Sequence, residues 1–274
     1  MPQFFVPKKN IQSNSFFFEP SESHHIARVL RKKPGDLIQI FDGEGWVGSA
    51  QITETSNSNK VKGEIFPAFD ADRCVPSSEK NHPDISLHLY PALIQNSNFE
   101  WMIQKVTEIG VTSIQPILTE RTQIHFSPEK SKTKITRWEK IILSAAKQSG
   151  RKTLPTISTP LSLKEVFKKI KKNDAPHPER TMQVTTKENS DDLKIILWEG
   201  EEKISLSKIL HQTQSFQKSK IHVFIGPEGG FTIEEIQETK KQGILAVTIG
   251  NNILRAETAS LVASSFILLH TEFS

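Results

Sequence analysis

The sequence contains a single cysteine, Cys74, which excludes an internal disulfide bond and a cysteine-rich metal site. It has no apolar run long enough to span a bilayer. Its first ten residues, MPQFFVPKKN, lack the charged start and the apolar stretch of a signal peptide. We therefore expect a cytoplasmic protein with no bound metal and no membrane partner.

The composition favours a folded protein. The chain has 274 residues, of which 36% are hydrophobic and 24% charged, enough for one large domain or two modest ones. The net charge of +4 and the pI of about 9.0 suggest a polyanionic partner such as a nucleic acid. A lysine-rich solvated surface would give the same charge, so charge alone leaves both interpretations open.

Residues 1–72 have the pattern of a small β-rich domain with one helix. Short strands are predicted at 3–6, 36–41, 46–52 and 61–66, with the hairpin signal Asp42-Gly43 between the second and third. A basic helix is predicted at 23–31. Because such short antiparallel strands need closure to bury one face, we expect a small β-barrel.

Residues 73–274 alternate strands with helices. A polar segment at 70–83 looks like a linker, and the polar stretch 171–192 looks like a surface loop. The predicted helices 99–109 and 135–149 end at Gly110 and Gly150, and a last helix is predicted at 257–270. The predicted strands are 85–90, 111–118, 195–198, 221–225 and 244–249. These short aliphatic runs indicate an α/β domain with a parallel sheet.

Three of these strands end in unusual loops: WEG at 198–200, IGPEGGFT at 225–232 and IGNNILRAET at 249–258. Parallel sheets bind ligands beyond the carboxyl ends of their strands. The glycines would let a ligand approach the backbone, yet the ending of a phosphate-binding P-loop is missing. Glu228 and Glu257 would repel a phosphate, so they favour a nucleoside that has a positively charged centre and no phosphate group. Thr232 and Glu235 form a capping box, so part of the second loop is structural.

Several motifs together resemble one family. IGPEGGFT-x-x-E-I and ILR-x-ETA are similar to the SPOUT methyltransferases, and most closely to the ribosomal RNA small subunit (uracil-N3)-methyltransferase family. HHIARVLR, FDGEG, EW-x-IQK-x-TE-x-GV, TER and RW-x-K-x-x-x-x-AA-x-QSGR extend the likeness from residue 24 to residue 259.

The resemblance implies a fold and an activity. It implies a trefoil-knotted parallel-sheet methyltransferase domain at 73–274, preceded by a PUA-like β-barrel domain at 1–72, and a homodimer. It implies that S-adenosylmethionine methylates N3 of a uridine in the 16S ribosomal RNA of the small ribosomal subunit. The donor-binding candidates, to which the first loop adds Trp198 and Glu199, are Ile225, Gly226, Glu228, Gly229, Ile249, Gly250, Ile253, Leu254 and Thr258.

Three departures from the family pattern remove positive charge. Asn251-Asn252 stands where Pro-Arg is usual, Gln95-Asn96 replaces a Lys-Gly pair, and Gln3 replaces an arginine. They motivate a second possible function, a non-catalytic RNA-binding protein with a degenerate methyltransferase fold. The chain could also be a SPOUT methyltransferase that acts on another RNA, or a nucleotide-dependent enzyme, although the missing P-loop argues against the last of these.

Methylation of N3 needs loss of its proton and stabilisation of the charge that spreads to the uracil oxygens. Arg255 is the first catalytic candidate, and an ion pair with Glu257 is its alternative role. Arg121, in the TER turn, is a second candidate whose alternative role is a structural salt bridge. Glu257 completes the catalytic set. Cys74 lies in the linker and is a poor nucleophile, which favours methylation of nitrogen over carbon.

Four basic residues are candidates for RNA contact. Arg28 and Arg31 lie three apart on the predicted basic helix, and Lys105 and Arg151 lie in the methyltransferase domain. Each could instead belong to a solvated charged surface. The adjacent His24 and His25 have no partner motif for a metal, so we expect them to pack or to contact phosphate.

Overall fold

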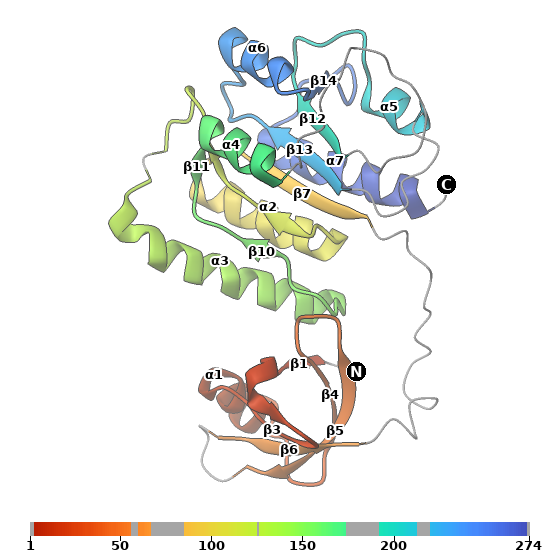
Figure 1. Ribbon diagram of the computed structural model, residues 1–274. Helices are drawn as coiled ribbons and strands as arrows, with labels where there is room; N and C mark the ends of the chain where they lie inside the picture. The colour runs from red at the N-terminus through yellow and green to blue at the C-terminus, as the bar shows by residue number, and fades with distance from the viewer. Residues whose placement is uncertain are drawn as a thin grey trace. The chain divides into compact units, whose positions relative to one another are not determined.

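The computed structural model describes residues 3–55, 60–66, 85–124, 126–173, 192–212 and 220–272. The chain divides into an N-terminal unit, Met1–Lys80 with Ile142–Leu154, and a C-terminal unit, Asn81–Ile141 with Pro155–Ser274 (Figure 1). The predicted linker at 70–83, with Cys74, lies outside the described residues. The predicted domain boundary between residues 72 and 73 lies there too, and stays a prediction.

The N-terminal unit is built on one curled six-stranded sheet (Figure 1). Its strand order is β1-β4-β5-β6-β3-β2, in which only β1 and β4 pair in parallel. The strands are β1 (Gln3–Phe5), β2 (Ile11–Gln12), β3 (Ser15–Phe17), β4 (Leu37–Phe41), β5 (Val47–Glu54) and β6 (Lys62–Ile65).

Four of these strands confirm the predictions at 3–6, 36–41, 46–52 and 61–66. β2 and β3 were not predicted, because two or three residues are too few to show an alternating pattern. Phe16 of β3 is nevertheless buried, and its ring packs directly on Gly63 of β6, where a Cβ atom would collide with it. The core is aromatic and aliphatic, with Phe4, Phe18, Ile26, Ile40 and Ile52 fully buried.

The helix predicted at 23–31 was partly right, because helical backbone runs from Pro20 to Val29 in two segments. A short helix, α1 (Pro20–His24), begins earlier because Pro20 suits its first turn, and a π-helical turn, η2 (His25–Val29), follows. Arg31 then adopts a left-handed backbone with a φ of 53°. Arg28 and Arg31 are both exposed, but they do not share a helical face.

The sheet of the C-terminal unit is parallel, as the sequence predicted, and has six strands, of which the one at Thr156–Ile157 was not predicted. Its order is β10-β8-β7-β13-β12-β14, and all its strand pairs are parallel. The strands are β7 (Ser86–Pro91), β8 (Ser113–Ile114), β10 (Thr156–Ile157), β12 (Leu193–Leu197), β13 (Lys220–Ile225) and β14 (Leu245–Val247).

The single strand predicted at 111–118 is two strands in different sheets. β8 joins the main sheet, whereas β9 (Ile117–Leu118) pairs with β11 (Leu161–Ser162) in a separate two-stranded sheet. Pro116 lies between β8 and β9 and has no N–H for a ladder hydrogen bond, which explains the break.

Six helices follow or flank these strands in the described part of the chain: α2 (Asn96–Ile109), α3 (Pro128–Ser149), α4 (Leu163–Asn173), α5 (Leu206–Gln212), α6 (Ile233–Lys241) and α7 (Ala256–Glu272). Gly110 and Gly150 have positive φ at the ends of α2 and α3, as predicted. α4 and α5 were not predicted. Within the described residues, no helix is both long and apolar enough to span a membrane.

The sheet is buried on both faces. α7 packs against β7 and β13, and α2 packs against α7. On the other face, α4 and α6 enclose a core with Tyr90, Ile196 and Phe224. The same face carries two stacked imidazoles, His88 and His222, whose ring centroids are 5.0 Å apart. A row of aromatic side chains therefore lies along the two central strands, β7 and β13.

His222 makes the stability of this unit depend on pH. Burial, and secondarily the charge of His88, lowers the pKa of the His222 imidazole to about 4. The unfolded chain takes up this proton below about pH 6.5 and the folded chain does not. The free energy of unfolding should therefore fall between pH 6.5 and about 4, by up to about 1.4 kcal/mol per pH unit.

Urea denaturation of the wild type and of His222→Gln tests this. We expect the variant to show a flatter pH dependence in that window, whereas His211→Gln, at an exposed histidine of α5, should keep the wild-type slope. Histidine NMR gives a direct check, because a His222 pKa near 6.5 would contradict the argument.

Candidate active site

The carboxyl ends of β13, β12 and β14 lie side by side. Leu197 at the end of β12 pairs with Ile225 of β13 on one side and with Val247 of β14 on the other. Because the three strands are parallel, the loops that follow them leave the sheet at one edge. We call residues 198–203, 226–232 and 248–255 the first, second and third edge loops.

The second edge loop is a tight turn that needs its glycines. The Gly230 N–H donates to the Pro227 carbonyl at 2.9 Å, and Gly230 has a φ of +68°. A Cβ atom on Gly226 would lie 3.1 Å from the Phe231 ring. Glu228 and Gly229, at the tip of the turn, are exposed. The backbone of this loop is therefore open to a ligand at its tip.

The second edge loop leads into α6 through the predicted capping box. Thr232 Oγ1 accepts from the Glu235 N–H at 3.2 Å, and Glu235 Oε2 accepts from the Thr232 N–H at 3.0 Å. The other carboxylate oxygen of Glu235 accepts from the Glu120 N–H at 2.9 Å. Glu235 thus joins the start of α6 to the turn that follows β9.

Arg121 belongs to this same connection. Its guanidinium donates to the Gly229 carbonyl at 2.7 Å, and the neighbouring Glu120 carboxylate accepts from the Thr232 hydroxyl at 3.3 Å. Within the described residues Arg121 makes no salt bridge, and its side chain contacts the Gly229 carbonyl, so both of its predicted roles stay predictions. We call the four residues Glu120, Arg121, Thr232 and Glu235 the loop latch, because they fix the second edge loop to the turn after β9.

The first edge loop places a carboxylate beside the second. A Cβ atom on Gly230 would fall on the Glu199 carboxylate, so the two loops touch there. Trp198 is partly buried against the core that α4 and α6 enclose, and the Lys240 ammonium lies 5.6 Å from the centroid of its ring. The first loop therefore offers a negative charge and an aromatic wall.

Most residues of the third edge loop are exposed. The side chain of Ile253 is 85% exposed, whereas Leu254 is half-buried. Gly250 has open space where a Cβ atom would stand. Arg255 is exposed, and its carbonyl accepts the Ala259 N–H that begins α7. Within the described residues Arg255 makes no ion pair with the half-buried Glu257, so the predicted alternative to a catalytic role is absent.

The predicted donor-binding and catalytic residues gather at this one edge. The edge loops, the ends of β13 and β14 and the start of α7 carry all of them except Arg121, which the loop latch brings to Gly229. The link from Glu235 to Glu120 was not predicted from the sequence. The capping box signalled Glu235, but no short-range pattern joins two residues 115 positions apart.

The four predicted RNA-binding residues divide between the two units. Arg28, Arg31 and Arg151 belong to the N-terminal unit, and Lys105 to the C-terminal unit. Burial lowers the pKa of Arg151 to about 10, so its guanidinium stays charged at neutral pH. Lys105 on α2 pairs with Glu108 at 2.9 Å, which leaves it less available to a phosphate than the exposed Arg28 and Arg31.

Comparison with known proteins agrees with this arrangement. An RNA methyltransferase domain model matches residues 80–268, and an RNA methyltransferase PUA domain model matches residues 18–66. The chain is 32% identical to ribosomal RNA small subunit methyltransferase E of Synechocystis over 243 residues, which cover 89% of this chain and 69% of the relative. It is 26% identical to the protein of that name in Bacillus subtilis, covering 99% and 98% of the two chains.

Two solved structures are similar over nearly their whole length. A methyltransferase from Legionella pneumophila, solved with S-adenosylmethionine, has 26% identity and a TM-score of 0.77, and the match covers 98% of this chain and 97% of that one. Ribosomal RNA small subunit methyltransferase E from Neisseria gonorrhoeae, bound to the same molecule, has 26% identity and a TM-score of 0.75 with the same coverage. The expected fold, a PUA-like domain followed by an α/β methyltransferase domain, is therefore confirmed, and this chain belongs to the ribosomal RNA small subunit methyltransferase E family of RNA methyltransferases.

Proposed function

We propose that this RNA methyltransferase transfers a methyl group from S-adenosylmethionine to N3 of a uridine in the 16S ribosomal RNA of the small subunit. The observation that carries the proposal is the convergence of three edge loops at adjacent parallel strands, with glycines, carboxylates and Arg255 at one place. Relatives over most of the chain are named as small subunit methyltransferases, and two similar structures hold S-adenosylmethionine.

The edge loops suit this donor. Gly226, Gly229 and Gly230 keep the second loop accessible to hydrogen bonding through its backbone. Ile253 and Leu254 offer apolar surface to an adenine ring, and Glu199 beside Gly230 suits a cationic group. When bound, S-adenosylmethionine supplies a methyl group on a positively charged sulfur. The remaining donor-binding candidates, Trp198, Ile225, Glu228, Ile249, Gly250 and Thr258, lie in or beside the same loops.

The acceptor chemistry falls to Arg255. Loss of the N3 proton leaves negative charge on the uracil oxygens, and a planar guanidinium can donate two hydrogen bonds to such an oxygen. Arg255 is exposed and its side chain has no ion-pair partner among the described residues, so it is available for this role. Glu257, in the first turn of α7, and Arg121, which holds the second loop, stay the other catalytic candidates.

The RNA and a second subunit are the proposed partners. The residues proposed to contact RNA phosphates are Arg28, Arg31, Lys105 and Arg151. The proposed bounds are 1–72 for the PUA-like domain and 73–274 for the methyltransferase domain. Val262, Phe266 and Leu269 of α7 are 40%, 39% and 52% exposed, which supports a homodimer that covers them. The trefoil knot stays a prediction, and a ribosomal RNA substrate favours a cytoplasmic location.

Nucleoside analysis tests the proposed reaction. Purified protein with labelled S-adenosylmethionine should methylate 16S ribosomal RNA, free or within small subunits, without added metal and in excess chelator. Digestion and mass spectrometry should identify N3-methyluridine as the product. Methyl groups on carbon 5, on a ribose or on another RNA would contradict the assignment, as would donor binding without any methyl transfer.

Replacement of Arg255 tests its catalytic role. Arg255→Ala should lower single-turnover methyl transfer by about a hundredfold, the usual effect of losing one donor to a developing oxyanion, with donor affinity changed little. Arg255→Lys should recover only part of the rate because it keeps the charge without the planar fork. Lys208→Ala, at an exposed position of α5, is the control and should behave as wild type. A parallel loss of donor affinity and rate in Arg255→Ala would make Arg255 a structural residue.

The loop latch should determine donor affinity. Glu235→Ala removes both the capping box and the bond to Glu120, and we expect S-adenosylmethionine affinity to fall roughly fivefold, which corresponds to the loss of one cap. Glu234→Ala is the matched control, since Glu234 is exposed on the same first turn of α6 and has no part in the box. Calorimetry measures both, and equal affinities in the two variants would show that the latch does not position the donor loop.

A further inference from the structure

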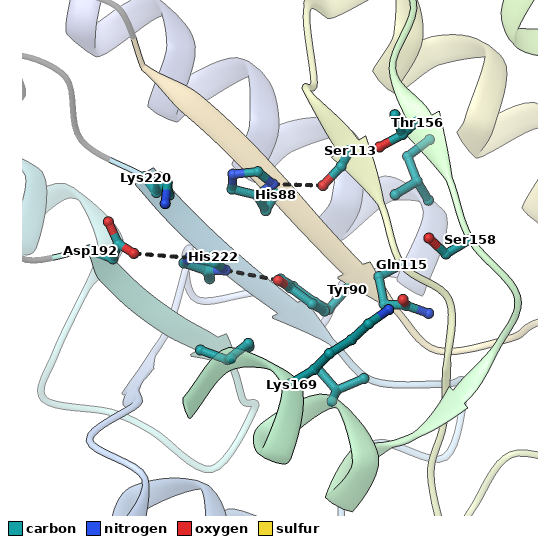
Figure 2. Close-up of a pocket in the computed structure, with 13 residues that line it drawn as sticks. His88, Tyr90, Ser113, Gln115, Thr156, Ser158, Lys169, Asp192, Lys220 and His222 are labelled. Atoms are coloured by element: carbon teal, nitrogen blue, oxygen red, sulfur yellow. Dashed lines mark hydrogen bonds and ion pairs between the residues drawn. The ribbon is translucent and has the colours of Figure 1, made fainter. Parts of the chain in front are cut away.

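A polar pocket lies in the C-terminal unit, away from the edge loops. It has a volume of about 240 Å³ and lies on the α4 side of the sheet, where β7, β13 and β8 contribute polar side chains (Figure 2). His222 on its floor precedes Gly226 by four residues of one strand, or about 13 Å of extended chain. The pocket is therefore separate from the proposed donor site.

Its floor holds two histidines that are each half satisfied. His222 Nδ1 lies 2.9 Å from the Tyr90 hydroxyl, and His88 Nδ1 lies 2.7 Å from the Ser113 hydroxyl (Figure 2). The Nε2 atom of each ring is buried and has no hydrogen-bond partner among the described residues. His222 is only 7% exposed. Since buried polar atoms normally have partners, these two nitrogens indicate a ligand that meets them in the pocket.

The neighbours of His222 determine which of its nitrogens carries the proton. Burial lowers the pKa of both imidazoles and raises the pKa of Tyr90, so at neutral pH the rings are neutral and the phenol keeps its proton. The Asp192 carboxylate, 3.7 Å from His222 Nε2, favours a proton on that nitrogen. Nδ1 then accepts from Tyr90, and His222 Nε2 is a donor that Asp192 faces from 3.7 Å, beyond hydrogen-bond distance.

Two lysines add positive charge to the same pocket. Lys220, at the start of β13, and Lys169 of α4 line it, with Asp192 as the acidic residue among the lining residues (Figure 2). Lys220 lies close enough to His88 for its charge to contribute to the lowered pKa of that ring. With both imidazoles neutral, the lining has a net positive charge. Hydroxyl groups of Thr156 and Ser158 add further hydrogen-bonding positions.

We propose that this pocket binds a small molecule through a carboxylate or phosphate group, which accepts from the imidazole nitrogens and from Lys220 and Lys169. The volume of about 240 Å³ is a little below the range of about 300–1,000 Å³ typical of pockets for drug-sized ligands, which suits a small metabolite. Among the described residues no group of three His, Cys, Asp or Glu side chains is placed to hold a metal ion.

A terminal oxyanion fits this pocket better than the RNA backbone. The imidazole of His222 lies at the floor and is almost completely covered, so only a group at the end of a molecule can reach it. A phosphodiester carries a sugar on each side of the phosphate, and the lining of the pocket includes the apolar side chains of Ile114, Val166 and Ile170, which offer those sugars no hydrogen bonds. The ligand of this pocket is therefore a free small oxyanion, independent of the RNA that the enzyme methylates.

Imidazole NMR of the full-length protein tests this with inorganic phosphate as the probe. The His88 and His222 Nε2 signals should shift and saturate at millimolar phosphate, and the pKa of His222 should rise because the bound anion favours the charged ring. The double variant Lys169→Gln/Lys220→Gln should bind phosphate at least tenfold more weakly, as expected for the loss of about 1.4 kcal/mol. Lys164→Gln, an exposed lysine on the same helix α4, should stay within twofold of wild type.

Three outcomes would overturn the proposal. In the first, the histidine signals do not move. In the second, they move without saturation and equally in the double variant, which means an adventitious ion only. In the third, a short RNA moves them while inorganic phosphate does not, which assigns the pocket to the polynucleotide. S-adenosylmethionine affinity and methyl transfer of the double variant should equal those of wild type if the pocket binds a free oxyanion, whereas methyl transfer should fall if it binds RNA. A wild-type rate in the double variant therefore separates failure of this proposal from failure of the proposed methyl transfer.

Discussion

The parallel pairing of β13 with β12, and of β12 with β14, is the constraint on which the rest of the site depends. The pairs of Leu197 with Ile225 and with Val247 align the strand ends, so three loops from distant parts of the chain begin at one level. The strands hold this register because both faces of the sheet are buried, against α7 on one side and α4 and α6 on the other. A shift by one residue would turn His222 and Phe224 toward α7 and take the loops out of line.

Alignment alone does not give the second edge loop a fixed shape. Its glycines allow the tight turn but also allow many other conformations, so the loop needs fixed points at its ends. Phe231 against Gly226 supplies one, and the latch of Glu120, Arg121, Thr232 and Glu235 supplies the other. The open tip at Glu228 and Gly229 is thereby held between two ordered segments, which is the arrangement that a preorganised binding loop requires.

The sequence predicted the parts that short-range patterns encode. The aliphatic runs of β12, β13 and β14, the glycine stops after α2 and α3 and the Thr232–Glu235 box depend on neighbours a few residues apart, and all were found. The break at Pro116 was missed because apolar residues continue on both sides of it. Contacts such as Arg121 to Gly229, 108 residues apart, depend on the sheet order, which no local pattern contains.

The residues of the central strand β13 differ in chemistry between its two faces and along the face that is turned to α4. Its alternating residues Ile221, Val223 and Ile225 are apolar and pack toward α7, while His222 and Phe224 face α4. Phe224 stacks on Tyr90 as a core residue should, whereas His222 in the next inward position keeps a buried nitrogen without a hydrogen-bond partner among the described residues. A phenylalanine at position 222 would extend the aromatic row without the free-energy cost of a buried nitrogen that lacks a hydrogen bond. Neither the loop alignment nor the packing requires an imidazole at this position. A ligand in the pocket would account for it, and the two lysines beside His222 indicate that this ligand is negatively charged.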